Sequence, residues 1–157
     1  CDGENADGFA IKEGTGTGNV LTGCRAWNNA DDGYDFFAWT SPVRLENSWA
    51  LDQSRTTEGS GSDGNGFKLG GDGVSAAHML SGLYATGNVN GSNGEGFTRN
   101  SNPASMMCSN CASWGNTGNG ADGISGLPGT APDATVADMI ADSARNADGS
   151  LKAINSL

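Results

Sequence analysis

The chain has 157 residues, of which 26 are glycine, and its formal net charge is −10. Glycine at this frequency excludes a helical bundle, because each glycine inside a helix costs roughly 1 kcal/mol relative to alanine, while hydrophobic residues at 36% are too many for a disordered chain. The acidic balance disfavours nucleic-acid binding, and no apolar run reaches the roughly 20 residues of a membrane span, so we predict neither a nucleic-acid nor a membrane partner.

A short unit recurs along the chain and consists of a small or acidic residue, a glycine and an apolar residue. In the early copies the residues one and three positions after the glycine are apolar, whereas the residue two positions after it varies. This alternation is typical of a short strand with one buried face. The glycines of the six copies, separated by 25 to 33 residues, are Gly8, Gly33, Gly66, Gly96, Gly123 and Gly149.

A second strand-like unit lies between successive glycine units and ends in a turn rich in small residues and asparagine. Its copies share an apolar column, which comprises Leu21, Leu45, Leu80, Cys108 and Ile140. They also share a polar end, which comprises Asn28, Asn88, Asn116 and Asn146. A repeat of this length with several short strands and no helix stacks as one coil of a solenoid. The sequence therefore predicts an all-β fold, a parallel β-helix of about five to six coils.

We expect residues 1–157 to form a single β-helix domain. The last copy fits less well, because Ser150 and Lys152 would point inward, so residues 129–157 are predicted to form a weaker terminal coil. No capping segment precedes the first copy, although terminal repeats of solenoids usually carry one. We therefore expect further coils upstream of residue 1.

The chain has four cysteines, Cys1, Cys24, Cys108 and Cys111. Cys108 and Cys111 form a C-x-x-C motif, which is typical of a redox pair or of half a metal site. Zinc is disfavoured because the chain has one histidine and no second C-x-x-C. Cys24 and Cys111 share a column but lie three coils apart, roughly 14 Å, too far for a disulfide. We expect buried free thiols packed as small hydrophobic residues.

Acidic residues gather at matching positions of the first two coils. Asp7, Asp31 and Asp32 come just before the glycine of their unit, and Asp35 comes two residues after the second glycine. Stacking brings these four carboxylates together, and their mutual repulsion favours a bound cation with hard oxygen ligands, Ca²⁺ above all. The alternative is a solvated turn, because Asp-Gly pairs are common in turns.

Lys68 occupies in the third unit the outward position that Asp35 occupies in the second. The two side chains are therefore predicted to be neighbours. A cation beside a lysine lowers the pKa of that lysine, and a neutral lysine is a candidate general base. The alternative is an ordinary surface lysine paired with Asp35.

Taken together, these motifs resemble polysaccharide lyase family 9, the pectate lyases built on a right-handed parallel β-helix. The resemblance covers about the first 115 residues in the same order. It is carried by ENADGFAIK (4–12), GNVLTGCRAWNNADDGYDFF (18–37), DGNGFKLGG (63–71) and GFTRNSNP (96–103). It implies Ca²⁺-dependent β-elimination of polygalacturonate, with Lys68 as the base and with the Ca²⁺ ligands Asp7, Asp31, Asp32 and Asp35.

The resemblance also implies a secreted protein whose partner is polygalacturonate or pectin, and we expect a monomer. An alkaline optimum follows, because the base must be uncharged. Arg99 stands where the family more often has an acidic residue. We interpret Arg99 either as a substrate contact or as a solvent-facing strand end.

Two other functions stay open from the residues alone. One is a non-catalytic β-helix module that binds polysaccharide or acts as an adhesin, and the other is a pectin hydrolase that uses two carboxylates. Trp27, Trp49 and Trp114 either form a sugar-stacking platform or pack in the wall. His78 is expected to stack or to lie on the surface rather than to catalyse, and the 56–66 loop either rims a cleft or is a mere insertion.

Overall fold

The computed structural model describes residues 5–54, 62–89, 93–127, 137 and 139. A first sheet is built from the short strands that follow the glycine units. These strands are β1 (Phe9–Ala10), β4 (Tyr34–Asp35), β7 (Phe67–Lys68), β10 (Phe97–Thr98) and β13 (Ala121–Asp122), in that spatial order. Within the described part of the chain, no helix has the length and apolar character needed to cross a membrane.

Two further sheets complete each coil. The second sheet contains β2 (Val20–Thr22), β5 (Arg44–Glu46), β8 (Met79–Ser81), β11 (Met106–Ser109) and β14 (Ile124–Ser125). The third sheet contains β3 (Arg25–Trp27), β6 (Trp49–Leu51), β9 (Tyr84–Thr86) and β12 (Ala112–Trp114). Each strand pairs in parallel with the strand of the next coil, as in β4 with β7 and in β5 with β8.

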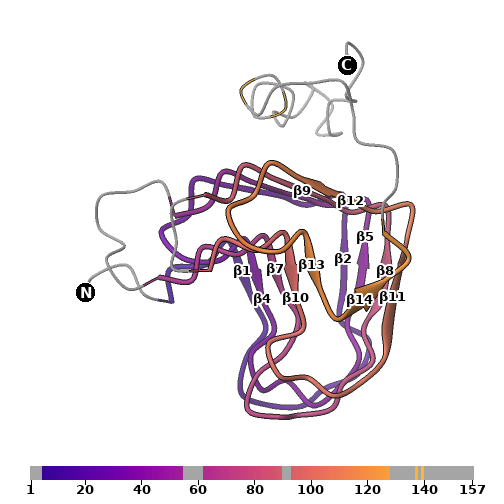
Figure 1. The fold of residues 1–157 in the computed structure, drawn as a ribbon. Coiled ribbons are helices and arrows are strands. Elements are labelled where there is room, and N and C mark those ends of the chain that lie inside the picture. Colours follow the sequence, from indigo (N-terminus) through magenta and orange to yellow (C-terminus); the bar gives the residue numbers. More distant parts are fainter. Residues whose placement is uncertain (1–4, 55–61, 90–92, 128–136, 138, 140–157) are drawn as a thin grey trace, which may run out of the picture.

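The three sheets line the walls of a tube (Figure 1). The predicted parallel β-helix is therefore confirmed, with five coils among the described residues. Several features predicted near the C-terminus lie outside these residues. They are the sixth glycine unit at Gly149, the column members Ile140 and Asn146 and, apart from residues 137 and 139, the terminal coil 129–157.

The glycine of each unit is required by the close approach of adjacent coils. A Cβ atom built on Gly33 would lie 2.6 Å from the carbonyl oxygen of Gly66, and one built on Gly66 would lie 2.6 Å from that of Gly96. The backbone N–H group after each glycine donates to the same oxygen, as Tyr34 does to Gly66 at 3.0 Å. A side chain at this position would separate the coils, which explains the repeat.

The register of the fifth coil differs from the prediction. The sequence analysis assigned Gly123 to the glycine column, but Phe97 pairs with Ala121 and donates its N–H to the carbonyl oxygen of Gly120 at 3.1 Å. Gly120 is therefore the column member. Both GNGAD and ADGIS fit the glycine unit, and the pairing of Ala121 with Phe97 selects the first.

Stacked side chains fill the tube. Four aromatic rings stack along the inner face of the first sheet, with centroid distances of 5.0 Å from Phe9 to Tyr34, 4.7 Å from Tyr34 to Phe67 and 4.8 Å from Phe67 to Phe97. The predicted apolar column of the second sheet is confirmed for its described members, which pair as Leu21–Leu45–Leu80–Cys108.

The cysteines depart from the prediction of free thiols. Cys108 and Cys111, both fully buried, form a disulfide, with a Cα–Cα distance of 5.7 Å. The sequence analysis noted the C-x-x-C motif as typical of a redox pair, but it tested only Cys24 against Cys111 for a disulfide and expected free thiols. Residues three apart come within disulfide range when the chain turns from one sheet to the next.

A ladder of amide side chains supports the turn that follows the third sheet. Asn29 donates to Gln53 Oε1 from its backbone N–H at 3.2 Å and from Nδ2 at 2.8 Å. The N–H group of Gln53 donates to Asn88 Oδ1 at 3.1 Å, and that of Asn88 donates to Asn116 Oδ1 at 3.1 Å. The prediction is confirmed for Asn88 and Asn116 but wrong for Asn28, because the neighbouring Asn29 is the ladder member.

The tryptophans of the third sheet do not form a shared exposed platform. Trp49 is buried, and the guanidinium carbon of Arg25 lies 3.6 Å from the centroid of its ring. Trp49 packs in one hydrophobic cluster with Met139, and the half-buried Trp114 packs against this cluster. Trp27 is exposed. Packing in the wall is therefore the role of Trp49 and Trp114.

Candidate functional site

The outer face of the first sheet holds two charged residues side by side. Asp35 on β4 pairs directly with Lys68 on β7, as the alternation predicts. Both side chains point away from the tube, yet Asp35 is 1% exposed and Lys68 is 9% exposed. The outward face is therefore covered by neighbouring polar side chains, and the charges lie in a partly desolvated setting.

The turn that enters the first sheet explains why aspartates lie next to this pair. Asp7 Oδ1 accepts the N–H of Asp32 at 3.2 Å, and Asp32 Oδ1 accepts the N–H of Asn65 at 2.7 Å. Asn65 Oδ1 accepts the N–H of Glu95 at 3.0 Å in turn. One oxygen of each side chain thus satisfies the backbone of the next coil, which fixes the orientation of the other oxygen.

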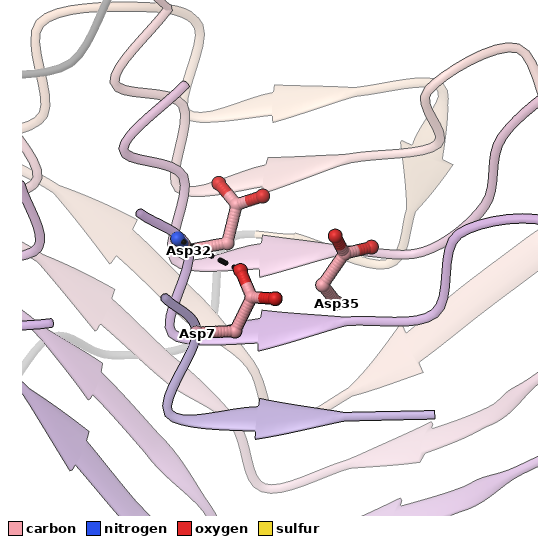
Figure 2. A group of neighbouring side chains, drawn as sticks. All are labelled: Asp7, Asp32 and Asp35. Atoms are coloured by element: carbon pink, nitrogen blue, oxygen red, sulfur yellow. Dashed lines mark hydrogen bonds between the residues drawn. The ribbon is translucent and has the colours of Figure 1, made fainter. Parts of the chain in front are cut away.

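The remaining carboxylate oxygens converge. Asp35 Oδ1 accepts the N–H of Phe37 at 2.8 Å. Asp7 Oδ2 and Asp32 Oδ2 are buried, and each faces a lysine ammonium, Lys12 Nζ at 2.6 Å and Lys68 Nζ at 3.2 Å respectively. Asp7, Asp32 and Asp35 each offer one oxygen, and these oxygens lie within 4.8 Å of one another (Figure 2). This set of hard oxygen donors is of the kind that Ca²⁺ prefers.

Asp31 adjoins this group but points elsewhere. Its Oδ2 accepts the N–H of Asn5 at 2.9 Å, and its Oδ1 accepts the N–H of Asp63 at 2.8 Å. Its carboxylate is not among the three that gather. The role of Asp31 as a cation ligand stays a prediction, and the contacts it makes here tie three chain segments together.

Three carboxylates surround the ammonium of Lys68. Its Nζ lies 3.2 Å from Asp32 Oδ2, 3.6 Å from Asp35 Oδ2 and 2.9 Å from Asp63 Oδ2. Burial lowers the pKa of Lys68, but the charges of these three carboxylates outweigh it and place the pKa above its ordinary value. Lys68 therefore keeps its proton unless another positive charge beside the aspartates lowers its pKa.

The sequence analysis does not predict Lys12 or Asp63. Lys12 Nζ lies 2.6 Å from both Asp7 Oδ2 and Asp35 Oδ2, and Asp63 contacts Lys68 from the segment that precedes β7. Alternation places Lys12 on the same outward face, two residues after Ala10 and directly after the inward-facing Ile11, so its direction was available from the pattern. The reach of its long side chain to the next coil was not.

Burial makes the carboxylate forms of two aspartates costly. Burial raises the pKa of Asp32 to about 8, an effect that the charge of Lys68 opposes only in part. Burial also raises the pKa of Asp7, against the opposing effect of Lys12. A multivalent cation bound to these oxygens would offset the cost, so the residues present fit a Ca²⁺ ion.

Arg99 lies beside β10, one coil beyond Lys68, and its side chain is exposed. Its Nε lies 3.8 Å from Asp122 Oδ2, whose residue shares the column of Lys68 and Thr98. The interpretation of Arg99 as a substrate contact stays a prediction.

Residues 1–125 match the family described as Pel9A-like, right handed beta helix region. The chain belongs to this family. The Pel9A-like match spans every predicted site residue, from Asp7 to Arg99, and gives the hand of the helix, which is right-handed.

Several known proteins are similar to this chain over most of its length. Pectate lyase L of Paenibacillus polymyxa (strain SC2) is 42% identical over 121 residues, which cover 72% of this chain and 26% of that protein. Pectate lyase PEL9 of Emericella nidulans is 38% identical over 136 residues, which cover 72% of this chain and 32% of that protein.

A solved structure agrees with the sequence matches. The crystal structure of pectate lyase Pel9A superimposes with a TM-score of 0.69 at 27% identity, over 96% of this chain and 46% of that one. The chain thus spans about a quarter to a third of the curated relatives it matches, and just under half of the solved one.

Proposed function

We propose that this chain carries the catalytic coils of a Ca²⁺-dependent pectate lyase. The observation that carries the proposal is the convergence of three aspartate oxygens directly beside a buried lysine on the outer face of one sheet. The pectate lyases to which the chain is similar support polygalacturonate as the substrate.

Asp7, Asp32 and Asp35 would hold the cation through their Oδ2 atoms, with Asp31 at the edge of the group. A Ca²⁺ ion held by these residues would supply the positive charge that offsets the repulsion between the acidic protein and the uronate carboxylate and that acidifies the C5 proton next to it. Asp32 and Asp35 connect cation binding to proton abstraction, because each also contacts Lys68.

Lys68 is the base of the proposed reaction. In its neutral form Nζ takes the proton from C5, the C–H electron pair becomes the C4–C5 double bond, and the C4–O bond breaks with its electrons leaving on the glycosidic oxygen, which takes a proton from water. The product carries a 4,5-unsaturated end. The aspartates around Lys68 hold Nζ in place, and Asp63 fixes it from the third coil at 2.9 Å.

The disulfide supports a secreted protein. Disulfides persist in oxidising compartments and are rare in reducing ones, and the Cys108–Cys111 bridge is fully buried in the coil. An extracellular polysaccharide is consistent with that location.

The test is incubation with polygalacturonate, with and without Ca²⁺, following the ultraviolet absorbance of the unsaturated uronate. We expect absorbance to rise only with Ca²⁺ and chelator to abolish it. Lys68→Arg keeps a positive charge among the aspartates but cannot become neutral, so activity should fall by about 10² to 10⁴-fold. Arg44→Gln, on the exposed outer face of the second sheet, is the control and should retain full activity.

Other outcomes separate the alternatives. Full activity of Lys68→Arg would remove Lys68 as the base. Depolymerisation without the unsaturated product would indicate a hydrolase. Binding of polygalacturonate without depolymerisation would favour a non-catalytic module. This alternative is tested because the chain spans only a quarter to a third of its curated relatives.

A further inference from the structure

Lys12 contacts the same oxygens that the proposed function assigns to the cation. Its Nζ lies 2.6 Å from Asp7 Oδ2 and 2.6 Å from Asp35 Oδ2, which belong to two different coils. A third polar contact, at 3.2 Å, joins Nζ to Asn5 Oδ1. The ammonium therefore lies at the meeting point of the two carboxylates.

The burial of this group gives Lys12 a defined electrostatic task. The side chains of Asp7 and Asp35 are each 1% exposed, and that of Lys12 is 20% exposed. Buried carboxylates need a counter-charge within contact distance. Lys68 supplies it chiefly to Asp32 and Asp63, which leaves Lys12 as the counter-charge of Asp7.

We propose that Lys12 is a built-in competitor that an incoming cation displaces from Asp7 and Asp35, and that it sets the affinity and the charge selectivity of this site. The inference rests on the proposed function, because it concerns the same carboxylates. Lys12 is a positioning residue here and touches no reacting atom.

The selectivity follows from charge. A monovalent ion that displaces the ammonium replaces one positive charge with another, so it gains little Coulomb energy from the aspartates. A divalent ion adds one unit of positive charge among three carboxylates and gains more. Lys12 thus weakens the binding of every cation. Na⁺ and K⁺ lose the larger fraction of their binding energy, because each carries the same charge as the ammonium that it must displace.

The test measures Ca²⁺ binding directly, by calorimetric titration of the chelator-treated full chain. Lys12→Gln and Lys12→Met remove the competing charge, and Arg44→Gln removes the same charge from the exposed outer face of the second sheet. At low salt we expect Lys12→Gln to bind Ca²⁺ about tenfold more tightly than the unchanged chain. Arg44→Gln should match the unchanged chain.

Salt supplies the second readout. In about 0.5 M NaCl general screening weakens all variants alike. Na⁺ should also compete for the site that Lys12→Gln leaves open. We therefore expect the Ca²⁺ affinity of Lys12→Gln to fall several-fold more than that of Arg44→Gln, whereas substituting choline chloride for NaCl removes this difference.

Defined results overturn the inference. Unchanged or weaker Ca²⁺ binding by folded Lys12→Gln and Lys12→Met does so. If neither neutral variant folds, Lys12→Arg decides, because its guanidinium holds both carboxylates more firmly and should weaken Ca²⁺ binding; equal affinity refutes the proposal. An unchanged chain that binds no Ca²⁺ removes the calcium part of the proposed function as well, and the two failures are thereby distinguished.

Discussion

His78 shows how one buried residue responds to pH. It is buried, its ring meets that of Phe36 edge-on at 5.1 Å, and its Nδ1 accepts the N–H of Val43 at 3.1 Å. The accepting Nδ1 requires a neutral ring, and burial lowers the pKa of His78 to about 4. The expectation of a surface position is wrong, and the ring packs edge-on against Phe36 rather than stacking face to face.

This shift predicts acid sensitivity that depends on His78. The folded-state pKa lies below the unfolded value of about 6.5, so the unfolded chain binds the proton first. Stability is complete above pH 6.5 and falls as pH drops toward 4, by up to about 3 kcal/mol. Urea unfolding at pH 7 and pH 4.5 should show a smaller loss for His78→Gln than for the unchanged chain. Equal losses would contradict the assignment.

Residue types and positions predicted part of the site, and long side chains account for the rest. Asp35 and Lys68 follow from alternation and stacking, because a Cβ direction is fixed by the strand. Lys12 and Asp63 act through side-chain reach and loop placement, which no period encodes. Asp31, the fourth predicted ligand, accepts two backbone N–H groups, one of them from Asp63, and its role as a ligand stays a prediction.

At the scale of the strand, hydrogen bonding between adjacent coils determines which residues belong to a column, and a matching sequence motif alone does not. The glycine column follows from a carbonyl oxygen of the next coil, so a motif that merely resembles the unit is not a member. Gly123 has the right neighbours in sequence but the wrong pairing, whereas Gly120 accepts from Phe97. Asn28 and Asn29 pose the same ambiguity, and the contact to Gln53 resolves it.

The glycine column predicts a contrast between two identical substitutions. A Cβ on Gly96 would lie 2.7 Å from the carbonyl oxygen of Gly120, whereas among the described residues the nearest atom to a Cβ on Gly120 is Ser113 Oγ at 3.5 Å. Gly96→Ala should therefore destabilise the chain by about 1–3 kcal/mol, and Gly120→Ala by less than about 0.5 kcal/mol. Denaturant unfolding measures both, and similar values would contradict the packing argument.

In the described part of the chain, the strands of each coil pair with those of the adjacent coils, so stability is expected to be a sum of local terms. The carboxylates that gather come from two coils, with Asp7 in the first and with Asp32 and Asp35 in the second. A cation held there would therefore join the first coil to the second. It would leave the contact between the third and fourth coils, made by β7 with β10, unaffected.

This locality predicts where Ca²⁺ stabilises the chain. At a free concentration about 100 times its Kd, a ligand adds about 2.7 kcal/mol to the state that binds it. Hydrogen exchange should slow at amides that join the first two coils, such as those of Phe9 and Ile11, which donate to Gly33 and Asp35. Amides of β12, in the fourth coil, should change little.

Asp7→Asn keeps the side-chain oxygen that accepts the N–H of Asp32 but removes the charge, so it should abolish the Ca²⁺-dependent protection. Uniform protection along all coils would instead indicate that cations act on the net charge and not on this pair of coils.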